Sequence, residues 1–388
     1  MNQGVFKYLK QDSVQFGVPV DEALLGEATQ RNARRVFVVT GRSLNRKTDA
    51  VTRAVSRVQD RVVGTFDDCI EHTPRETVLA LAAQVRSAQA DLIVSIGGGT
   101  VIDTVKVALV ALAENLTQVD QLNDWHMKMN ADGSRFVPVP RMPPCRQIAV
   151  PTTLSGAEFS DLGGCTDTRF GTKHGFTGDY IGAAAVILDP QITLHTPDRL
   201  WLSTGIRAID HAVEALCSVN AQPLIDATSV RALALLSRSL RAYSHDKNDL
   251  AARLDGQLGA WLAAMSIRRA EYGASHGMGH ALGADAGVPH GITSCVLLPT
   301  VMRYNAAVCA AQMAEIARAL GDARQPAADQ VEALIASLGL PTRLSQLGLD
   351  RARLPVIAQK SMANPWVHSN PRKIAYESDV LELLEQAW

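Results

Sequence analysis

The sequence lacks a long apolar run, an excess of charge of either sign and any close pairing of cysteines. No stretch of about 18 apolar residues is present to span a bilayer. The 38 Lys and Arg residues balance 39 Asp and Glu, and the formal charge of −1 gives nucleic acid or an anionic membrane no electrostatic advantage as a partner. The chain of 388 residues, 47% of them hydrophobic, is long enough for two domains with separate cores.

Two further absences concern the compartment. The six cysteines are scattered and form no CxxC motif, so a disulfide framework is not expected in a chain of this length. The N-terminal sequence, MNQGVFKYLKQDSVQFG, contains no apolar core of signal-peptide length. We therefore expect a cytoplasmic protein with reduced thiols that acts on a small molecule rather than on nucleic acid or a membrane.

The first half of the chain alternates between β-branched runs and helical patterns. The expected strands cover residues 35–40, 91–96, 147–150 and 184–188, and the expected helices cover residues 43–62, 73–90 and 101–113. Strands that are apolar on both faces and separated by helices indicate a parallel sheet with both faces covered. We predict a Rossmann-like α/β nucleotide-binding domain over residues 1–190.

The second half of the chain has almost no strand-like run after residue 190. Alanine and leucine become frequent, and helical patterns are expected at residues 204–219, 223–242, 249–270, 306–320 and 327–338. The predicted fold class is therefore α/β plus all-α, with an all-helical domain over residues 191–388.

A glycine turn follows the strand at residues 91–96. Gly97, Gly98 and Gly99 precede Thr100, which we expect to cap the next helix, and Asp103 lies one turn further on. Glycines let backbone N–H groups approach a phosphate, and a helix N-terminus favours an anion. A tight turn of purely structural importance is the alternative, because the motif is neither GxGxxG nor a P-loop.

A second loop with hydroxyl groups follows the strand at residues 147–150. It contains Thr152, Thr153 and Ser155. The carboxyl ends of parallel strands form the crevice in which α/β proteins bind their ligands, so this loop is a second candidate for contact with a nucleotide.

Four of the ten histidines fall in one pattern of the second half. His211 lies on a predicted helix, His276 and His280 are four residues apart, and His290 follows in a PHG segment. Residues at i and i+4 share a face if the segment is helical. Imidazoles that converge in one pocket suit either metal ligation or proton transfer.

Taken together, these motifs resemble the iron-containing (group III) alcohol dehydrogenase family. The family's GGGSxxDxxK motif is similar to residues 97–106 (GGGTVIDTVK), and its PTTxxxGSE segment is similar to residues 151–158 (PTTLSGAE). Its GxDAxxHAxE helix resembles residues 205–214 (GIRAIDHAVE), and its HGxxHxLG and PHG segments match residues 276–283 and 289–291. The resemblance implies the fold of this family and of dehydroquinate synthase, with a nucleotide-binding domain before a helical domain.

The resemblance also implies a nicotinamide cofactor. The residues expected to hold it are Gly97, Gly98, Gly99, Thr100, Asp103, Thr152, Thr153, Ser155 and Lys173, of which Lys173 corresponds to a ribose-contacting lysine. NAD-dependent members carry an Asp after the first strand, whereas this chain has Gly41, Arg42 and Ser43 there. Because no carboxylate at that place repels a 2′-phosphate, we expect NADPH in preference to NADH, with use of both left open.

The chain departs from the family at the implied metal site. Its members bind Fe or Zn with one Asp and three His, and His211, His276 and His290 match the three histidines, but Arg207 replaces the Asp. A guanidinium about 4 Å from a divalent ion costs roughly 8 kcal/mol at an effective dielectric constant of 20. Either Arg207 swings away from a metal, or no metal binds and Arg207 acts on a carbonyl or a substrate carboxylate; we favour the second.

The maleylacetate reductase branch of the family also lacks the Asp, and residues 72–74 (HTP) and 259–262 (GAWL) resemble that branch. We therefore expect an NAD(P)H-dependent oxidoreductase that interconverts a carbonyl and an alcohol, with an oxo-acid substrate. Arg207, His211 and His276 form the expected catalytic centre, with His280 as proton relay. The alternatives are a metal-dependent alcohol dehydrogenase and a catalytically inactive homologue that binds nucleotide and serves as a scaffold. We expect a homodimer, formed through an edge strand near the N-terminus.

Overall fold

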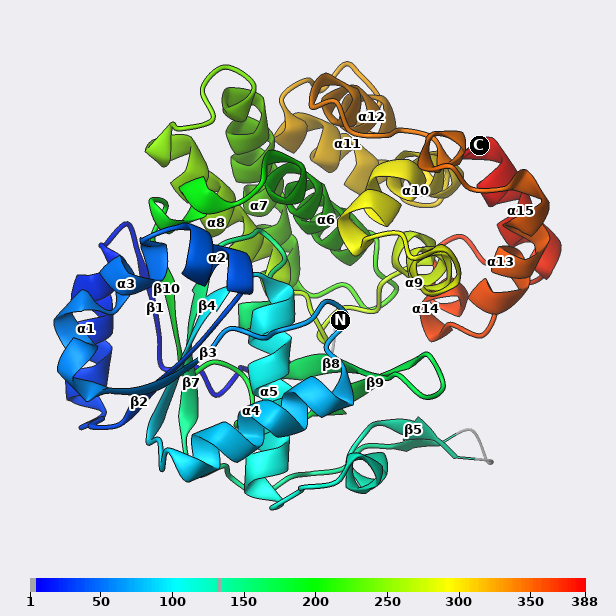
Figure 1. Ribbon diagram of the computed structural model, residues 1–388. Helices are drawn as coiled ribbons and strands as arrows, with labels where there is room; N and C mark the ends of the chain where they lie inside the picture. The colour runs from blue at the N-terminus through cyan, green and yellow to red at the C-terminus, as the bar shows by residue number, and fades with distance from the viewer. Residues whose placement is uncertain (1–4, 131–133) are drawn as a thin grey trace. The chain divides into compact units, whose positions relative to one another are not determined.

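The computed structural model describes residues 5–130 and 134–388 of the chain. The chain divides into two compact units, one of Lys7–Thr196 and one of Met1–Phe6 with Pro197–Trp388. The first unit is built on a parallel sheet and the second on helices (Figure 1). The predicted fold class, α/β plus all-α, is confirmed.

A six-stranded sheet forms the centre of the first unit. Its strand order is β1-β10-β7-β4-β2-β3, and all neighbouring pairs are parallel. The strands are β1 (Ser13–Phe16), β2 (Val36–Thr40), β3 (Val62–Phe66), β4 (Leu92–Gly97), β7 (Arg146–Pro151) and β10 (Ala185–Leu188). The glycine turn and the Thr152 loop therefore follow adjacent strands, β4 and β7.

Helices cover both faces of this sheet, and strand β2 shows how. Val36 and Val38 are buried on the face covered by α1 (Val20–Gln30) and α3 (Ala50–Ala54). Phe37 and Val39 are buried on the opposite face, under α4 (Arg75–Ser87) and α5 (Gly99–Ala113). Because both sets of alternating side chains enter a core, the strand is apolar throughout.

The prediction of one helix over residues 43–62 is wrong. The segment forms α2 (Arg42–Lys47), α3 and the 3-10 helix η1 (Ser56–Arg61). Thr48 adopts an extended backbone, its hydroxyl donates to the carbonyl of Leu44, and the same oxygen accepts from the N–H of Ala50. A threonine side chain thus takes over hydrogen bonds that a continuing helix would make.

Two antiparallel hairpins, which the sequence did not lead us to expect, complete the first unit. They are β8 (Leu162–Asp167) with β9 (Thr172–Thr177), and β5 (Lys128–Met129) with β6 (Arg135–Phe136). The short 3-10 helices are η2 (Val119–Asp124), η3 (Ala157–Phe159) and η4 (Ile192–His195).

The second unit has no strand among its described residues. Helix α6 (Asp198–Leu216) packs against α7 (Pro223–Tyr243), α8 (Leu250–Ala264) and α10 (His290–Asn305). The remaining elements are α9 (Ala274–Ala286), α11 (Ala310–Leu320), α12 (Ala327–Ser337), η5 (Leu344–Leu347), η6 (Arg351–Arg353), α13 (Leu354–Ser361), α14 (Pro365–His368) and α15 (Glu377–Gln386). Helix α6 is buried along most of its length, so its polar side chains lie inside this unit.

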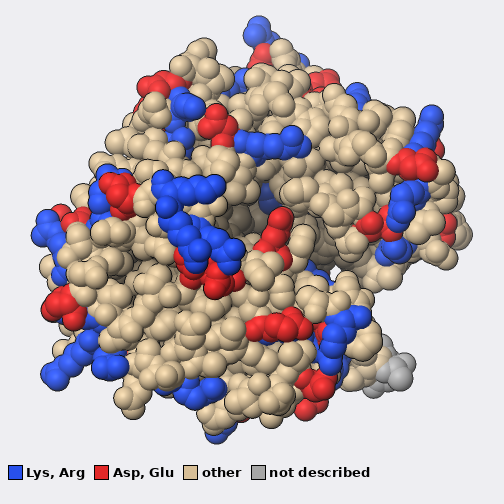
Figure 2. All heavy atoms as spheres, viewed as in Figure 1, with Lys and Arg blue, Asp and Glu red and all other residues tan. Residues whose placement is uncertain are grey.

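Charges of both signs are interspersed on the surface. Figure 2 shows basic side chains beside acidic ones over much of the face in view. Among the described helices, none has the length and apolar character needed to cross a membrane.

Candidate functional site

The glycine turn lies where β4 passes into α5. Strand β4 ends at Gly97, Gly98 is the N-cap, and α5 begins at Gly99. No side chain caps this helix, so the prediction that Thr100 does so is wrong; Thr100 lies within the first turn. The first N–H groups of an α-helix lack intrahelical partners, so an uncapped N-terminus that follows glycines is suited to a phosphate.

The loop after β7 lies against this turn. The N–H of Thr152 donates to the carbonyl of Gly97 at 3.0 Å. A Cβ on Gly98 would lie 3.0 Å from the Thr153 methyl, and one on Gly99 would lie 3.1 Å from the Ser155 hydroxyl. The structure therefore brings the two predicted nucleotide-contacting loops together and leaves little room for a side chain at Gly98 or Gly99.

Asp103 and Lys173 meet at the β8–β9 hairpin. Asp103 accepts from the N–H of Gly164 at 3.1 Å and from buried Lys106 Nζ at 3.2 Å. A Cβ on Gly164 would overlap Lys173 Cε and lie 3.1 Å from its Nζ. The missing side chain at Gly164 thus makes room for the exposed Lys173 beside Asp103.

We expected no carboxylate beside the loop that follows β2. The structure places two there. Arg42 forms an ion pair with Asp68, which also forms an isolated β-bridge with Gly41. Arg46 pairs with Asp67 at 2.8 Å, and this bond lowers the pKa of Asp67 to about 2. The expectation failed because Asp67 and Asp68 follow the neighbouring strand β3, which the sequence did not predict.

Helix α6 presents four polar side chains on one buried face. Arg207, Asp210, His211 and Glu214 occupy positions i, i+3, i+4 and i+7, which is the spacing of one helical face. All four are buried, and Asp210 is fully so. A helix face with this composition inside a core requires partners for every charge.

Arg207 and Asp210 form the first part of this centre. Arg207 Nη1 donates to Ser294 Oγ at 3.1 Å and lies 3.5 Å from Asp210 Oδ2. The hydroxyls of Ser294 and Ser275 donate to the same oxygen of Asp210 at 2.6 and 2.9 Å. Burial opposes the charged forms, but the charges of His276 and Arg207 hold the pKa of Asp210 below its ordinary value.

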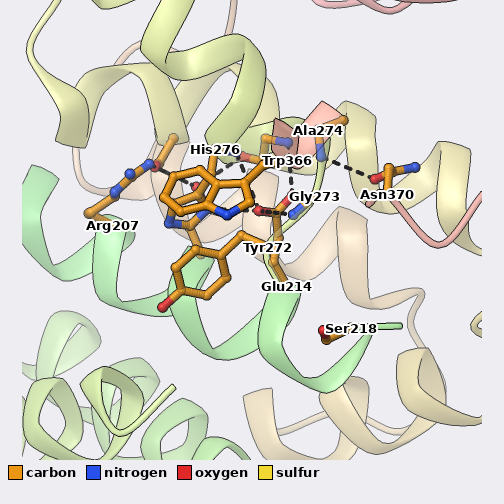
Figure 3. A network of polar contacts seen from close by, with 12 residues as sticks. Arg207, Glu214, Ser218, Tyr272, Gly273, Ala274, His276, Trp366 and Asn370 are labelled. Atoms are coloured by element: carbon orange, nitrogen blue, oxygen red, sulfur yellow. Dashed lines mark hydrogen bonds and ion pairs between the residues drawn. The ribbon is translucent and has the colours of Figure 1, made fainter. Parts of the chain in front are cut away.

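Glu214 and His276 form the second part (Figure 3). Glu214 accepts from the backbone N–H groups of Gly273, Ser275 and His276 at 3.0, 2.8 and 3.3 Å, at the start of α9. It also accepts from His276 Nδ1 at 2.7 Å. With the Nδ1–H of His276 committed to Glu214, its buried Nε2 has no hydrogen-bond partner within the part of the chain that the structure describes.

Aromatic rings flank the histidines. The ring of Tyr272 stacks on His276 at 4.1 Å and on His211 at 5.4 Å between centroids, and Trp366 meets His276 edge-on at 5.8 Å. Tyr272 and Trp366 also meet each other, with their ring centroids 5.4 Å apart, so the three rings form one cluster (Figure 3). Burial, and then the cationic charges of neighbours led by His276 and Arg207, put the pKa of His211 well below its ordinary value, so this ring is neutral.

His280 and His290 lie together, with their ring centroids 5.4 Å apart. His280 is half-buried one turn beyond His276 on α9, and its Nδ1 lies 3.3 Å from Asn364 Nδ2. His290 is exposed at the first residue of α10. The four predicted histidines thus lie in one part of the helical unit. His276, His280 and His290 all contribute to the lowered pKa of His211.

The residues present do not fit a resident divalent metal. Asp210, Glu214 and His276 bring ligand-type atoms within 4.8 Å of one another. However, Glu214 already accepts four N–H groups, including the His276 Nδ1–H that lies between the two carboxylates. In the set that the resemblance implies, the cationic Arg207 takes the place of the acidic ligand, and Arg is not deprotonated in proteins.

Six residues of this centre were not predicted from the sequence: Asp210 as a counter-charge, Glu214, Ser275, Ser294, Asn364 and Trp366. The positions of Asp210 and Glu214 on the face of Arg207 and His211 were a usable signal. Nothing in the sequence indicated the other four, which enter from other helices.

Comparison with known proteins matches both units to one family. The model described as iron-containing alcohol dehydrogenase matches residues 14–190, and the model of the C-terminal part of the Fe-containing alcohol dehydrogenase family matches residues 201–388.

Individual relatives match over nearly the whole chain. Dehydrogenase FUM7 of Gibberella moniliformis is 32% identical, covering 96% of this chain and 95% of its own. Maleylacetate reductase 1 of Rhodococcus opacus is 30% identical, covering 94% of this chain and 93% of its own. The structure of sulfoacetaldehyde reductase from Bifidobacterium kashiwanohense in complex with NAD+ has the same fold, with a TM-score of 0.86, 21% identity and 99% of each chain covered.

Proposed function

The chain belongs to the iron-containing alcohol dehydrogenase family, and we propose that it reduces an anionic oxo-acid to the hydroxy-acid without a resident metal. It is an oxidoreductase of the carbonyl–alcohol couple that uses a nicotinamide cofactor, as its family and its relatives establish. The proposal concerns the substrate, the metal and the role of each residue.

The nucleotide-binding unit fits the cofactor. The uncapped start of α5 and the N–H groups of the glycine turn would hold the pyrophosphate, and Thr152, Thr153 and Ser155 would line it. Asp103 would orient the β8–β9 hairpin, so that Lys173 reaches a ribose. When bound, the reduced nicotinamide supplies the hydride.

We propose NADPH as the preferred cofactor, with NADH also accepted. Arg42 follows β2, where the adenosine ribose binds in dinucleotide folds, and a guanidinium there attracts a 2′-phosphate. Its pairing with Asp68 reduces this attraction, which is why NADH is not excluded. Arg42→Ala should lower kcat/KM for NADPH about 10-fold and leave that for NADH unchanged.

One observation carries the substrate assignment. Arg207 is buried, but Asp210 and Ser294 contact only its Nη1, and Nε and Nη2 make no hydrogen bond to the described residues. Its side chain keeps 10% of its surface exposed. A guanidinium with two uncommitted donors beside a buried histidine cluster is suited to pair with a carboxylate of the substrate.

Two of the relatives have substrates with that charge. Maleylacetate is a dicarboxylic oxo-acid and sulfoacetaldehyde carries a sulfonate, and both are named as the substrates of reductases. An anionic substrate also suits a centre in which a cation replaces the acidic metal ligand. Within this proposal His280 contacts the oxygen of the reacting carbonyl, and neutral His211 and the Glu214-bound His276 line the site.

The proposal is tested by Arg207→Gln, which keeps part of the aliphatic stem and a polar end group but removes the charge. A hydrogen-bonded ion pair is worth about 1.5–3 kcal/mol, so KM for an oxo-acid such as maleylacetate should rise roughly 10- to 150-fold. KM for an uncharged aldehyde should change by less than about 2-fold. Equal effects on both substrates, or no effect on either, would refute the assignment.

The homodimer remains a prediction. Strand β1 is an edge strand of the six-stranded sheet, as the hypothesis requires, and the oligomeric state is measured directly by light scattering.

A further inference from the structure

The two histidines on α9 are held in opposite ways by their hydrogen-bond partners. His276 gives its Nδ1–H to the Glu214 carboxylate, whose oxygens also accept three backbone N–H groups. His280, one turn further on, meets an amide group through the same ring atom, Nδ1. Which ring nitrogen carries the proton is set by the partner of the other nitrogen.

The orientation of the Asn364 amide is fixed by the start of α14. Asn364 is the N-cap of this helix, and its side-chain oxygen accepts the backbone N–H of Trp366 at 3.0 Å. A backbone N–H can only donate, so Oδ1 must face Trp366 and Nδ2 must face His280. The N–H of Val367 donates to the Asn364 carbonyl at 3.1 Å, which further fixes the residue.

The amide nitrogen, in turn, fixes the tautomer of His280. An NH2 group donates and does not accept, and it lies 3.3 Å from His280 Nδ1. Nδ1 must therefore accept, so the neutral ring carries its proton on Nε2.

We propose that Asn364 is a positioning residue that keeps a proton of His280 on Nε2, so that this N–H donates a hydrogen bond to the substrate oxygen. The inference rests on the proposed function, in which His280 contacts that oxygen. The donor stabilises the negative charge that develops on the oxygen during hydride transfer. No bond at His280 breaks, and the alkoxide takes its proton from solvent.

The indole of Trp366 packs against both histidine rings and restricts their orientation. The indole of Trp366, two residues from Asn364, lies 5.0 Å from the ring of His280 and 5.8 Å from that of His276. The segment that begins α14 therefore supplies both the Asn364 amide and the Trp366 indole that contact the histidines of α9. Glu214 holds His276 through Nδ1, and Asn364 makes His280 a donor through Nε2.

Asn364→Asp is the informative variant, because Asp is also a good N-cap and preserves the bond to the Trp366 N–H. Its second oxygen would accept from His280 Nδ1 and draw the proton away from Nε2. In alkaline buffer, where imidazoles are neutral, kcat for reduction should fall about 100-fold, the size of effect seen when one oxyanion donor is removed. KM for the oxo-acid should stay within about 3-fold, because Arg207 is unchanged.

Asn364→Ser is the matched control. Serine also caps a helix but carries no N–H group toward His280, so the tautomer loses its bias without being reversed. We expect a fall in kcat of about 10-fold or less. The double variant of Asn364→Asp with His280→Gln should be no slower than His280→Gln alone, because both changes remove one donor.

A spectroscopic measurement tests the tautomer without activity. With 15N-labelled histidine, and with His280→Gln to identify the signals, wild-type His280 should show a protonated Nε2 and an unprotonated Nδ1, and Asn364→Asp should reverse them. A protonated Nδ1 in the wild type overturns the inference, as does Asn364→Asp with unchanged kcat. If His280→Gln turns over normally, the role of His280 in the proposed function fails instead.

Discussion

Gly164→Ala is a small change that should weaken cofactor binding because it displaces the side chain of Lys173. Gly164 lies in β8, and a Cβ there would overlap Lys173 Cε and approach its Nζ to 3.1 Å. Lys173 is exposed and flexible, so its side chain can move aside without disturbing the core. The backbone N–H of residue 164 and its bond to Asp103 remain.

The expected magnitude follows from what the ammonium group loses. A hydrogen bond to a charged group is worth about 1.5–3 kcal/mol, so Kd for NADPH or NADH should rise roughly 10- to 150-fold if the ribose contact is lost. The free energy of unfolding should fall by about 1 kcal/mol or less, because no buried group is displaced. Fluorescence titration with the reduced cofactor measures the first quantity, and chemical denaturation measures the second.

Two further variants make the result decisive. Gly163→Ala adds a methyl on the same strand, 3.0 Å from Val107 Cγ2 and away from Lys173, and should change stability more than cofactor affinity. Lys173→Ala should match the loss in Gly164→Ala, and the two should not add. Normal cofactor affinity in Gly164→Ala, or additive losses, would refute the assignment of Lys173.

Two other predictions concern buried charges. Asp210→Asn leaves the guanidinium of Arg207 with Ser294 as its remaining partner, and should lower the free energy of unfolding by about 3–5 kcal/mol, measured in urea. Burial raises the pKa of Glu158 to about 7 from 4.5, so its charged form destabilises the folded chain progressively between those pH values. Glu158→Gln should therefore match the wild type near pH 4 and exceed its unfolding free energy by up to ~3 kcal/mol at pH 8; a constant difference across this range would contradict the cause.

The sequence was most informative where the local pattern and the tertiary environment agree. Strands β2, β4, β7 and β10 are apolar on both faces because both faces are covered, so their composition alone identified them. Strand β8, with the sequence LGGCTD, alternates between buried and half-exposed positions and contains two glycines, which makes it unrecognisable by β propensity. The close approach of Lys173 and of α5 explains both glycines.

The candidate site was predictable in its residues more than in its contacts. Helical spacing identified the face of α6 with Arg207 and His211, and the i,i+4 pair of His276 and His280. The partners that fix their charge and tautomer come from segments far away in the chain, such as Ser294 and Asn364. Serine and asparagine are common in caps and loops, so their types carry no signal until the fold places them.

The central claim is that Arg207 takes the place of a metal ligand and that the enzyme works without a bound metal. Metal content should be measured by elemental mass spectrometry after loading with Fe(II) and Zn(II) and dialysis, on the same sample that oxidises NADPH with an oxo-acid. The account predicts metal well below one equivalent per chain, with turnover intact and insensitive to chelators. Near one equivalent of Fe or Zn per chain, with activity lost on chelation, would contradict it.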